Sequence, residues 1–429
     1  MSTILDYKLQ RYYKHILKIT DSTEELKSQY YCGSKVLKIA DEIPAVYVSS
    51  DGKDSSFFGV TNCKNSWSCP VCSVREMSKH ANDISCAIDA LDYWYHQSAA
   101  MITLTILHVK YMTAEDVEWI LRHTWKDFTI HGNGKQKANP KDVFASFCRT
   151  FNSTHRVRVG EATHGKNGFH FHYHCLFWFP SHRLQEIKEW EEKLNARWNE
   201  LAKRNTLKLW AKKYPEGVKN GANEAKVNKI YEHADCNGSQ GLYISKDKKG
   251  NVIKQESSHY ICGWGADKEL TGNFQNKASQ MGHRTPHQIL EDFAKTGDMQ
   301  DAYLYIEFAK AAKGKARINF SVHSGIKAII AKWKKTNMYL RVLQKKSTDL
   351  DRKKWKVICW LRESQWSEIS RLETTTEPLI KHNILNLAKE EDGKKRITEY
   401  LEQFHIYISI NDFIPNERIK FIEKMLQSA

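Results

Sequence analysis

The segment 169–180, FHFHYHCLFWFP, constrains the fold of this chain more than any other. Side chains of a β-strand point alternately to its two faces, so the pattern predicts a strand with His170, His172 and His174 on one face. The aromatic residues share the other face, where a core can bury them. Histidines two positions apart on a strand can bring imidazole nitrogens to one ion. We therefore interpret the row as a metal site rather than as structural histidines.

A preceding strand is predicted at 155–163, where HRVRVGEAT alternates with period two. The short turn at 163–168 allows the two strands to pair in antiparallel fashion. Glu161 then ends an apolar face, and a carboxylate in such a place needs a partner, which a bound cation supplies. The alternative is a strand-end glutamate that reaches water. A mixed His/Glu site would accept Mg²⁺ or Mn²⁺ and keep positions open for phosphate oxygens.

The neighbouring segments mix strands with helices. MITLTIL at 101–107 is typical of a buried strand, and residues 113–128 are typical of a helix that Thr113 caps. A long amphipathic helix is predicted at 183–204 and a hairpin at 242–255. Pairing strands with interspersed helices predict an α+β fold.

Cysteines near the N-terminus predict a structural zinc site. Cys69 and Cys72 enclose a Pro-Val pair in a CPxC knuckle, and Cys63 lies shortly before them. Four thiolates around one ion make a closed tetrahedral zinc site, whereas buried free cysteines are the alternative. The spacing leaves the fourth ligand open, and the candidates, in order of preference, are Cys32, His80 and Cys86.

Positive charge dominates the composition, with 66 Lys and Arg against 50 Asp and Glu and a formal net charge of +16. Such an excess indicates a polyanionic partner, most simply nucleic acid. Residues 310–356 carry 15 basic and two acidic residues, a net of +13, with aromatic residues among them. This composition suits phosphate contacts and base stacking, although the aromatic residues can equally pack inward. The predicted DNA contacts are Lys313, Lys315, Arg317, Lys332, Lys334, Lys335, Lys353 and Lys354.

Composition also excludes several classes of protein. Hydrophobic residues make up 41% of the 429, which is ample for a core and excludes a mostly disordered chain. No unbroken apolar run reaches ~18 residues, so we expect no membrane span. The N-terminal segment is charged and aromatic and lacks the apolar core of a secretory signal, so we expect the protein in the cytoplasm. Its ten cysteines are then expected to be free or metal-bound rather than paired in disulfides.

Two tyrosines downstream of the histidines are candidate nucleophiles. Tyr243 stands in the predicted hairpin together with Lys246, and Tyr260 stands in a helix predicted to begin at Ser257 or Ser258. A tyrosine oxygen can attack a phosphodiester if a metal polarises the phosphate, and the bond energy is then kept in a phosphotyrosine link. Most tyrosines are packing residues, so neither one alone carries this prediction.

In their order, these segments resemble the HUH endonucleases, and most closely the rolling-circle replication initiators (Rep proteins) of plasmids. The resemblance rests on MITLTIL at 101–107, on EATHGKNGFHFHYHCLF at 161–177 and on a downstream tyrosine. The segment with CPVC before the first motif and the stretches WGADKELTG and RTPHQILEDF after the tyrosine are similar too. The resemblance covers about residues 30–335 and is weak beyond them.

The resemblance implies an α+β fold with a central antiparallel sheet of the HUH endonuclease type, flanked by helices. The sheet would carry the histidine pair on its middle strand. His172 and His174 match the constant metal ligands of the family. Glu161 matches the usual third ligand, with His170 as a flanking alternative. The metal would be Mg²⁺ or Mn²⁺.

The family resemblance also bears on the nucleophile. Tyr260 matches by its surroundings, although Gly263 stands where the family often has lysine. Tyr243 has the Tyr-x-x-Lys letters with Lys246 but lies in a different context. Glu256 precedes Tyr260 by four residues, where some initiators use a glutamate to activate water for the terminating cleavage. The alternative is that Glu256 only favours a helix N-terminus.

Three regions are expected along the chain: residues 1–95 with the zinc module, 96–300 with the HUH endonuclease domain, and 301–429, basic and mainly helical. In the last region, 356–372 and 377–404 are predicted amphipathic helices. Helical packing is the first interpretation, and a winged-helix-like DNA module, a dimerisation element and a helicase contact are the alternatives. The implied function is initiation of rolling-circle plasmid replication by metal-dependent nicking of origin DNA and strand transfer through a 5′-phosphotyrosine. No Walker A pattern is present, so a separate host helicase and a DNA polymerase are expected partners.

Other functions remain open at this point. A transposase or a relaxase would use the same chemistry. A non-enzymatic zinc-containing DNA-binding regulator would need only the cysteines and the basic segment. An RNA-processing nuclease fits the tyrosine and histidine motifs poorly. The oligomeric state, including a dimer on DNA, is also open.

Overall fold

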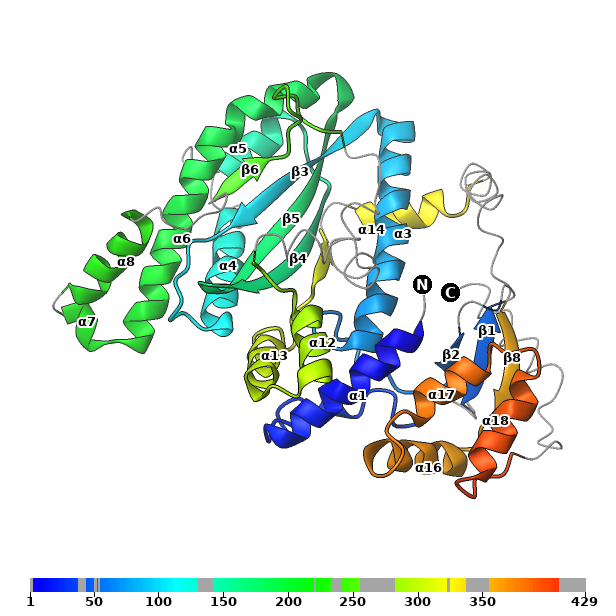
Figure 1. Ribbon diagram of the computed structural model, residues 1–429. Helices are drawn as coiled ribbons and strands as arrows, with labels where there is room; N and C mark the ends of the chain where they lie inside the picture. The colour runs from blue at the N-terminus through cyan, green and yellow to red at the C-terminus, as the bar shows by residue number, and fades with distance from the viewer. Residues whose placement is uncertain are drawn as a thin grey trace. The chain divides into compact units, whose positions relative to one another are not determined.

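The computed structural model describes residues 3–37, 44–49, 52, 55–129, 142–219, 221–232, 241–254, 282–321, 325–336 and 355–408. The chain forms two compact units (Figure 1), one of residues 1–76, 290–306 and 340–429 and the other of residues 77–289 and 307–339. The fold is α+β with antiparallel sheets and many helices, as predicted from the sequence. The domain boundaries near residues 95 and 300 stay a prediction.

The larger unit is built on a five-stranded antiparallel sheet in the order β6-β3-β5-β4-β7. The predicted histidine strand is β5, the middle strand, and the two strands predicted before it in the sequence are β3 and β4, which flank it in the sheet. The predicted hairpin begins with β6 and closes through a bridge between Lys246 and Val252. The five strands are β3 (Gln97–Thr105), β4 (Arg156–Gly165), β5 (Gly168–Pro180), β6 (Leu242–Ile244) and β7 (Ile318–Phe320).

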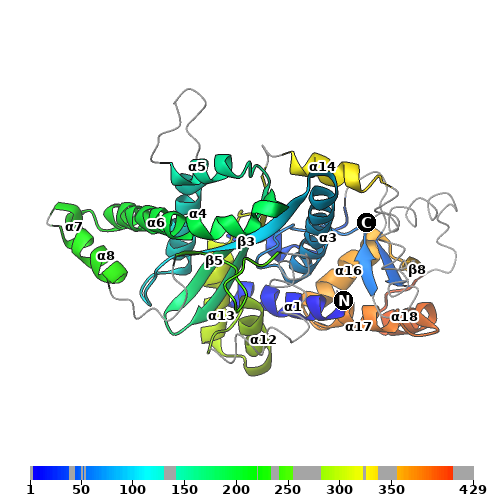
Figure 2. The ribbon, with the colours of Figure 1, turned by 90° about the horizontal axis from the view of Figure 1, so that it is seen from above.

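Helices cover both faces of this sheet (Figure 2). On one face, α4 and α5 present aromatic rings to β5: Trp125 lies 6.1 Å from Tyr173, and Phe144 lies 5.8 Å from Phe177, between ring centroids. On the other face, α3 and α14 pack on the apolar side chains of β3, β4 and β5. The helices are α3 (Pro70–Tyr95), α4 (Ala114–Thr129), α5 (Val143–Thr150), α6 (Glu191–Lys213), α7 (Glu216–Lys219), α8 (Ala222–Glu232) and α14 (Ile326–Trp333).

Local sequence signals account for several helix ends. The backbone N–H of Asp116 donates to Thr113 Oγ1 and that of Thr113 to Asp116 Oδ2, both at 3.2 Å, so Thr113 caps α4 as predicted. The helix predicted at 183–204 begins as a 3₁₀ segment, η1 (Ser181–Trp190), before α6 continues to Lys213. Among the described residues, no helix is long and apolar enough to cross a membrane.

The smaller unit has a three-stranded antiparallel sheet in the order β2-β1-β8. Its core holds Tyr7, Phe57 and Trp366, whose rings meet edge to face with centroids 5.2 and 4.8 Å apart. Its elements are α1 (Thr3–Ile19), α2 (Lys27–Tyr30), β1 (Ala45–Ser49), β2 (Ser55–Phe58), β8 (Trp355–Trp360), α16 (Glu363–Thr374), α17 (Ile380–Leu387) and α18 (Gly393–Glu402). Helices α12 (Pro286–Thr296) and α13 (Met299–Ala311) complete the described elements.

The prediction of a helix over 356–372 is wrong for its first part. Residues up to Trp360 belong to β8, which pairs with β1 from Ala45 opposite Trp360 to Ser49 opposite Trp355, and α16 begins only at Glu363. A short apolar run does not distinguish strand from helix by its periodicity. The pairing strand lies at the other end of the chain, so tertiary contact decided the outcome.

A buried charge network joins the C-terminal helices to the N-terminal part of the same unit. Glu373 Oε2 accepts from Lys381 Nζ at 2.9 Å and from Lys14 Nζ at 3.1 Å. The two lysines also donate to Gly33 O and Ser34 Oγ, both at 2.9 Å. Burial alone would raise the pKa of Glu373, but the two lysine charges hold it below its ordinary value, while burial lowers the pKa of Lys381 to about 8.

Because Glu373 is the carboxylate shared by two buried lysines, its neutral replacement leaves their charges uncompensated. We expect Glu373→Gln to lower the free energy of unfolding by about 3–5 kcal/mol in urea titrations followed by tryptophan fluorescence. Glu368→Gln, on the exposed side of α16 where Glu368 pairs with Arg371, is the matched control and should leave the midpoint unchanged. Equal effects of the two substitutions would contradict this role of the network.

Candidate functional site

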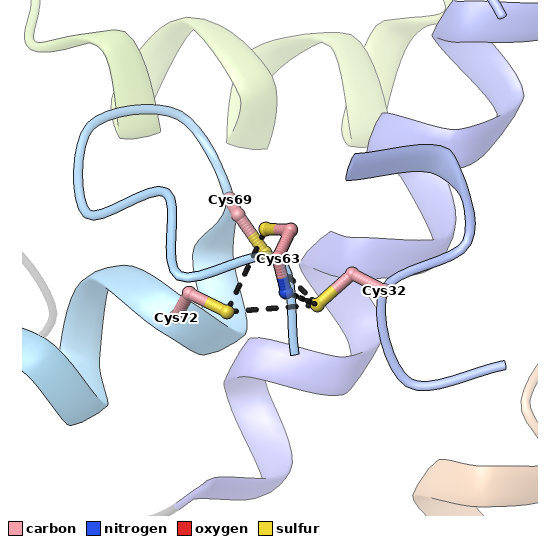
Figure 3. Close-up of side chains that lie close together, drawn as sticks. All are labelled: Cys32, Cys63, Cys69 and Cys72. Carbon is pink, nitrogen blue, oxygen red and sulfur yellow. Dashed lines mark hydrogen bonds between the residues drawn. The ribbon is translucent and has the colours of Figure 1, made fainter. Parts of the chain in front are cut away.

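The structure brings together the four cysteines of the predicted zinc module (Figure 3). Cys32 follows α2, Cys63 follows β2, and Cys69 and Cys72 lie at the start of α3. The Sγ atoms are 3.5 Å apart for Cys32 and Cys72 and 3.6 Å apart for Cys63 and Cys72 and for Cys69 and Cys32. The CPxC knuckle works because Pro70 opens the helix, where a missing N–H costs nothing.

This cluster is consistent with a structural zinc site. A tetrahedron with Zn–S bonds of about 2.3 Å has edges of about 3.8 Å, close to the observed separations. Three of the four side chains are buried, so the set is closed and leaves no room for a substrate. Burial raises the pKa of Cys69, whereas hydrogen bonds from the other three thiols lower that of Cys32. A bound cation would favour the ionised form of these thiols, because zinc binds thiolates.

Hydrogen bonds from outside the cluster orient its members. Gln10 Oε1 accepts from Cys69 Sγ at 3.2 Å, and Gln10 Nε2 donates to Gln29 O at 3.3 Å. The backbone N–H of Cys63 donates to Cys32 Sγ at 3.4 Å. The alternative fourth ligands have other surroundings: His80 lies beside Asp83 and Phe320, and Cys86 is in the core with α3 residues.

Zinc content tests the cluster directly. We expect about one zinc ion per purified chain by elemental mass spectrometry and loss of most of it in Cys69→Ser, together with a lower thermal midpoint. Cys148→Ser changes a half-buried cysteine outside the cluster and should keep the metal. A zinc content that Cys69→Ser leaves intact would show that the cluster does not hold the ion.

A second group of metal-binding side chains lies on the sheet of the larger unit. In the pairing of β4 with β5, Glu161 is directly opposite His172. In the pairing of β3 with β5, Thr103 is directly opposite His174. His172 Nε2 and His174 Nε2 lie 2.9 and 3.1 Å from the same oxygen, Glu161 Oε2. Side chains directly opposite each other in an antiparallel sheet share a face. The group is therefore a product of strand register.

The aromatic side chains of β5 lie on the opposite face, as predicted. Phe169, Phe171, Tyr173 and Phe177 are all buried there. Glu161 and His174 are themselves buried at 3% and 1% exposure, whereas His172 is half-buried. The group therefore lies at the edge of a core, with an approach from the His172 side.

Burial and mutual contact set the charge of this group. Burial lowers the pKa of His174 to about 4, so the ring is neutral near pH 7. Burial alone would raise the pKa of Glu161, but the charge and hydrogen bonds of His172 and His174 hold it well below its ordinary value. Two imidazole nitrogens and one carboxylate oxygen are a donor set for a divalent cation.

The geometry also fits such an ion. An octahedral ion with bonds of about 2.1 Å has ligand edges of about 3.0 Å, which the two nitrogen–oxygen distances match. Three protein donors leave coordination positions for other oxygens. His170, the alternative ligand, lies next to His108 with their ring centroids 5.1 Å apart. The described donor group contains Glu161, His172 and His174 without it.

Thr103 belongs to this group and was not predicted from the sequence. Its Oγ1 lies 3.0 Å from His174 Nδ1. A hydrogen bond there fixes the ring with Nε2 toward Glu161, as partners of metal-binding histidines commonly do. The signal was present in MITLTIL, where polar threonines interrupt an apolar strand, but only the sheet register assigns Thr103 to His174.

The structure describes two of the four predicted catalytic residues, Tyr243 and Lys246. Tyr260 and Glu256 lie outside the described residues. Tyr243 is half-buried in β6 directly opposite Thr103, so it shares the face that carries His174. Lys246 forms an ion pair with Glu191 at the start of α6.

Several predicted DNA contacts are engaged inside the larger unit. Arg317 is buried and donates from Nε to Gly160 O at 3.2 Å. Lys315 pairs with the buried Glu118, and Lys334 pairs with Asp83 at 2.6 Å. Lys313, Lys332 and Lys335 are exposed, while Lys353 and Lys354 lie outside the described residues.

The aromatic residues of this basic segment do not all face solvent. Trp333 is 2% exposed and packs with its ring centroid 5.3 Å from that of Trp94. Lys332 Nζ lies 4.8 Å from the ring centroid of Trp94. The inward-packing alternative therefore holds for Trp333.

Comparison of the chain with protein-family models, with curated proteins and with solved structures gives no match. The two candidate metal sites and the sequence motifs around them are therefore the features that indicate a function.

The contact between Thr103 and His174 predicts an effect on metal affinity. We expect Thr103→Val to weaken Mn²⁺ binding by about 10- to 100-fold in titration calorimetry, because His174 loses the partner that orients its ring. Thr124→Val removes another buried threonine hydroxyl, on α4 at the other face of the sheet, and should bind Mn²⁺ as the unchanged protein does. An equal loss in both variants would indicate a general effect on folding.

Proposed function

We propose that this protein is a metal-dependent DNA nickase and strand transferase of the HUH type that initiates rolling-circle plasmid replication. The observation that carries the proposal is that His172 and His174, on the middle strand of an antiparallel sheet, both contact one oxygen of Glu161 on the adjacent strand. The order of the sequence motifs supports it. The sheet would be that of the HUH endonucleases.

The side chains of the chain have distinct parts in the proposed reaction. His172, His174 and Glu161 would hold Mg²⁺ or Mn²⁺, and Thr103 would orient His174. The bound ion would supply Lewis-acid polarisation of the scissile phosphate. The phosphate would approach from the half-buried His172, whereas Glu161 is buried and accepts from both histidines.

The proposed nucleophile is a tyrosine oxygen. It bonds to phosphorus while the bond from phosphorus to the 3′-oxygen breaks, the phenol proton passes to solvent, and the 3′-oxygen leaves as a hydroxyl. This gives a 5′-phosphotyrosine and a free 3′-end for a polymerase. The same steps in reverse rejoin a strand without ATP, and Glu256 would activate water for the terminating cleavage.

Tyr260 is the first choice for the nucleophile because of its sequence context. A specific observation keeps Tyr243 as the second: Tyr243, Thr103 and His174 occupy one cross-strand row. Lys246 would not assist Tyr243 freely, since it is paired with Glu191.

The remaining parts of the proposal concern recognition. The zinc module and the exposed lysines of the basic segment would bind origin DNA as duplex and single strand. A host helicase and a DNA polymerase in the cytoplasm would complete replication. A transposase or relaxase would share the chemistry but act at a different DNA locus.

Formation of a covalent adduct tests this function. We expect the full chain with Mn²⁺ and single-stranded oligonucleotides from the neighbouring plasmid origin to give a denaturation-resistant adduct on Tyr260. Tyr260→Phe should abolish it and Tyr243→Phe should keep it, with the modified peptide identified by mass spectrometry. His172→Ala should reduce the adduct below detection, whereas His182→Ala, an exposed histidine on η1, should not.

Two other results are informative. An adduct on Tyr243 would retain the enzyme and move the nucleophile to β6. Absence of any adduct, with tight duplex binding that needs no divalent metal, would contradict the nickase and favour the non-enzymatic regulator.

A further inference from the structure

A second basic region, distinct from residues 310–356, lies on the larger unit. Residues 203–229 carry eight Lys and Arg and two Glu, a net of +6. They form the end of α6, the short α7 and α8, which we call the α6–α8 arm (Figure 1). Lys212, Lys219, Lys226 and Lys229 are all exposed.

Two tyrosine rings stand exposed next to this charge. Tyr111 is 65% exposed and Tyr214 is 56% exposed, and each lies against the buried Trp210, with ring centroids 6.0 and 6.1 Å away. Exposed aromatic rings among lysines are the features of proteins that stack bases and neutralise phosphates. Trp210 is itself buried, so the two tyrosine rings are the part of this aromatic group that a ligand can reach.

The surface is held rigidly. Asn223 Nδ2 at the start of α8 donates to Tyr214 O at 2.8 Å and to Trp210 O at 3.4 Å, which closes the end of α6. Lys213 pairs with Asp116 of α4 at 2.5 Å. A preorganised surface loses less entropy when it binds a flexible strand.

The same surface is continuous with the surroundings of the metal-binding group. Tyr111 lies in the loop that leaves β3, between Lys110 and Met112. Their carbonyl oxygens lie 3.8 Å from where a Cβ would stand on Gly168, the first residue of β5. Further back in this loop, His108 packs on His170. A single strand of DNA that lies over Tyr111 would thus continue toward His108 and His170.

We propose that Tyr111 and Tyr214 form a base-stacking surface for single-stranded DNA and that lysines of the α6–α8 arm contact its phosphates. Single-stranded DNA is favoured over duplex because duplex bases already stack on one another and do not offer their faces to a ring. The charge complements the phosphates. That the bound strand leads to the metal-binding group rests on the proposed function.

Binding of a fluorescent oligothymidylate of about 20 nucleotides in EDTA, followed by anisotropy, tests the surface without any chemistry. The double variant Tyr111→Ala/Tyr214→Ala should bind about tenfold or more weakly, since each stacked base contributes substantially. The double variant Tyr111→Phe/Tyr214→Phe keeps the rings and should bind as the unchanged protein. Tyr303→Ala removes a tyrosine that is 60% exposed on α13 and is the matched control.

The lysines are tested by salt dependence. Lys212→Gln/Lys226→Gln should lower the slope of log affinity against log salt by about 1.4, from about 0.7 per phosphate contact on a single strand. Thermal midpoints of the lysine variants should stay unchanged, because these side chains are exposed.

Unchanged DNA affinity in the double alanine variant would overturn the proposal. This is also the result expected if the surface binds an acidic protein and not DNA. Failure of the proposed function is distinguishable. If the alanine variant loses affinity in EDTA but the unchanged protein forms no adduct in Mn²⁺, the stacking surface is supported and the nickase function is contradicted. If the alanine variant binds DNA normally and forms a normal amount of adduct, the nickase function is supported and the stacking surface is contradicted.

Discussion

The register between β4 and β5 is the constraint on which the candidate active site depends. It places Glu161 opposite His172, so that a carboxylate oxygen and two imidazole nitrogens meet on one face. Because side chains alternate along a strand, a slip of one residue would send Glu161 to the aromatic face and leave a buried carboxylate without partners. The aromatic side chains of β5 are buried on the other face of the strand, and this fixes which face of β5 carries the histidines.

The two candidate metal sites differ in their closure and burial. The four cysteines come from three separate segments of chain, and they link α2, β2 and the first residues of α3 within the smaller unit. The Glu161–His172–His174 group has three donors, comes from two adjacent strands, and has one partly exposed member. Closed four-thiolate sets stabilise folds, whereas open sets keep positions for substrates. The smaller unit adds a buried lysine–glutamate network that contacts the residues following Cys32.

Much of this arrangement could be predicted from local patterns. The alternation in FHFHYH predicts a strand because aromatic residues and histidines fall on opposite faces. The cap at Thr113 could be predicted because it is a local hydrogen bond.

Features that depend on distant segments could not be predicted. β8 pairs with β1 across most of the chain, Arg317 is buried against Gly160, and Thr103 is assigned to His174 by the sheet alone. Charge counts along the sequence cannot separate lysines paired inside a unit from lysines that face solvent.

The sequence by itself determined the three histidines on one strand face, the antiparallel partner that carries Glu161, and the cysteine knuckle, because each follows from the geometry of neighbouring residues. Only the tertiary structure decided that Cys32 joins Cys63, Cys69 and Cys72, since its position depends on how α2 packs. It likewise decided that Tyr243 shares the face of His174 and that Tyr111 and Tyr214 flank Trp210. The physical reason is that contacts between distant segments are set by burial and register, and spacing along the chain encodes neither.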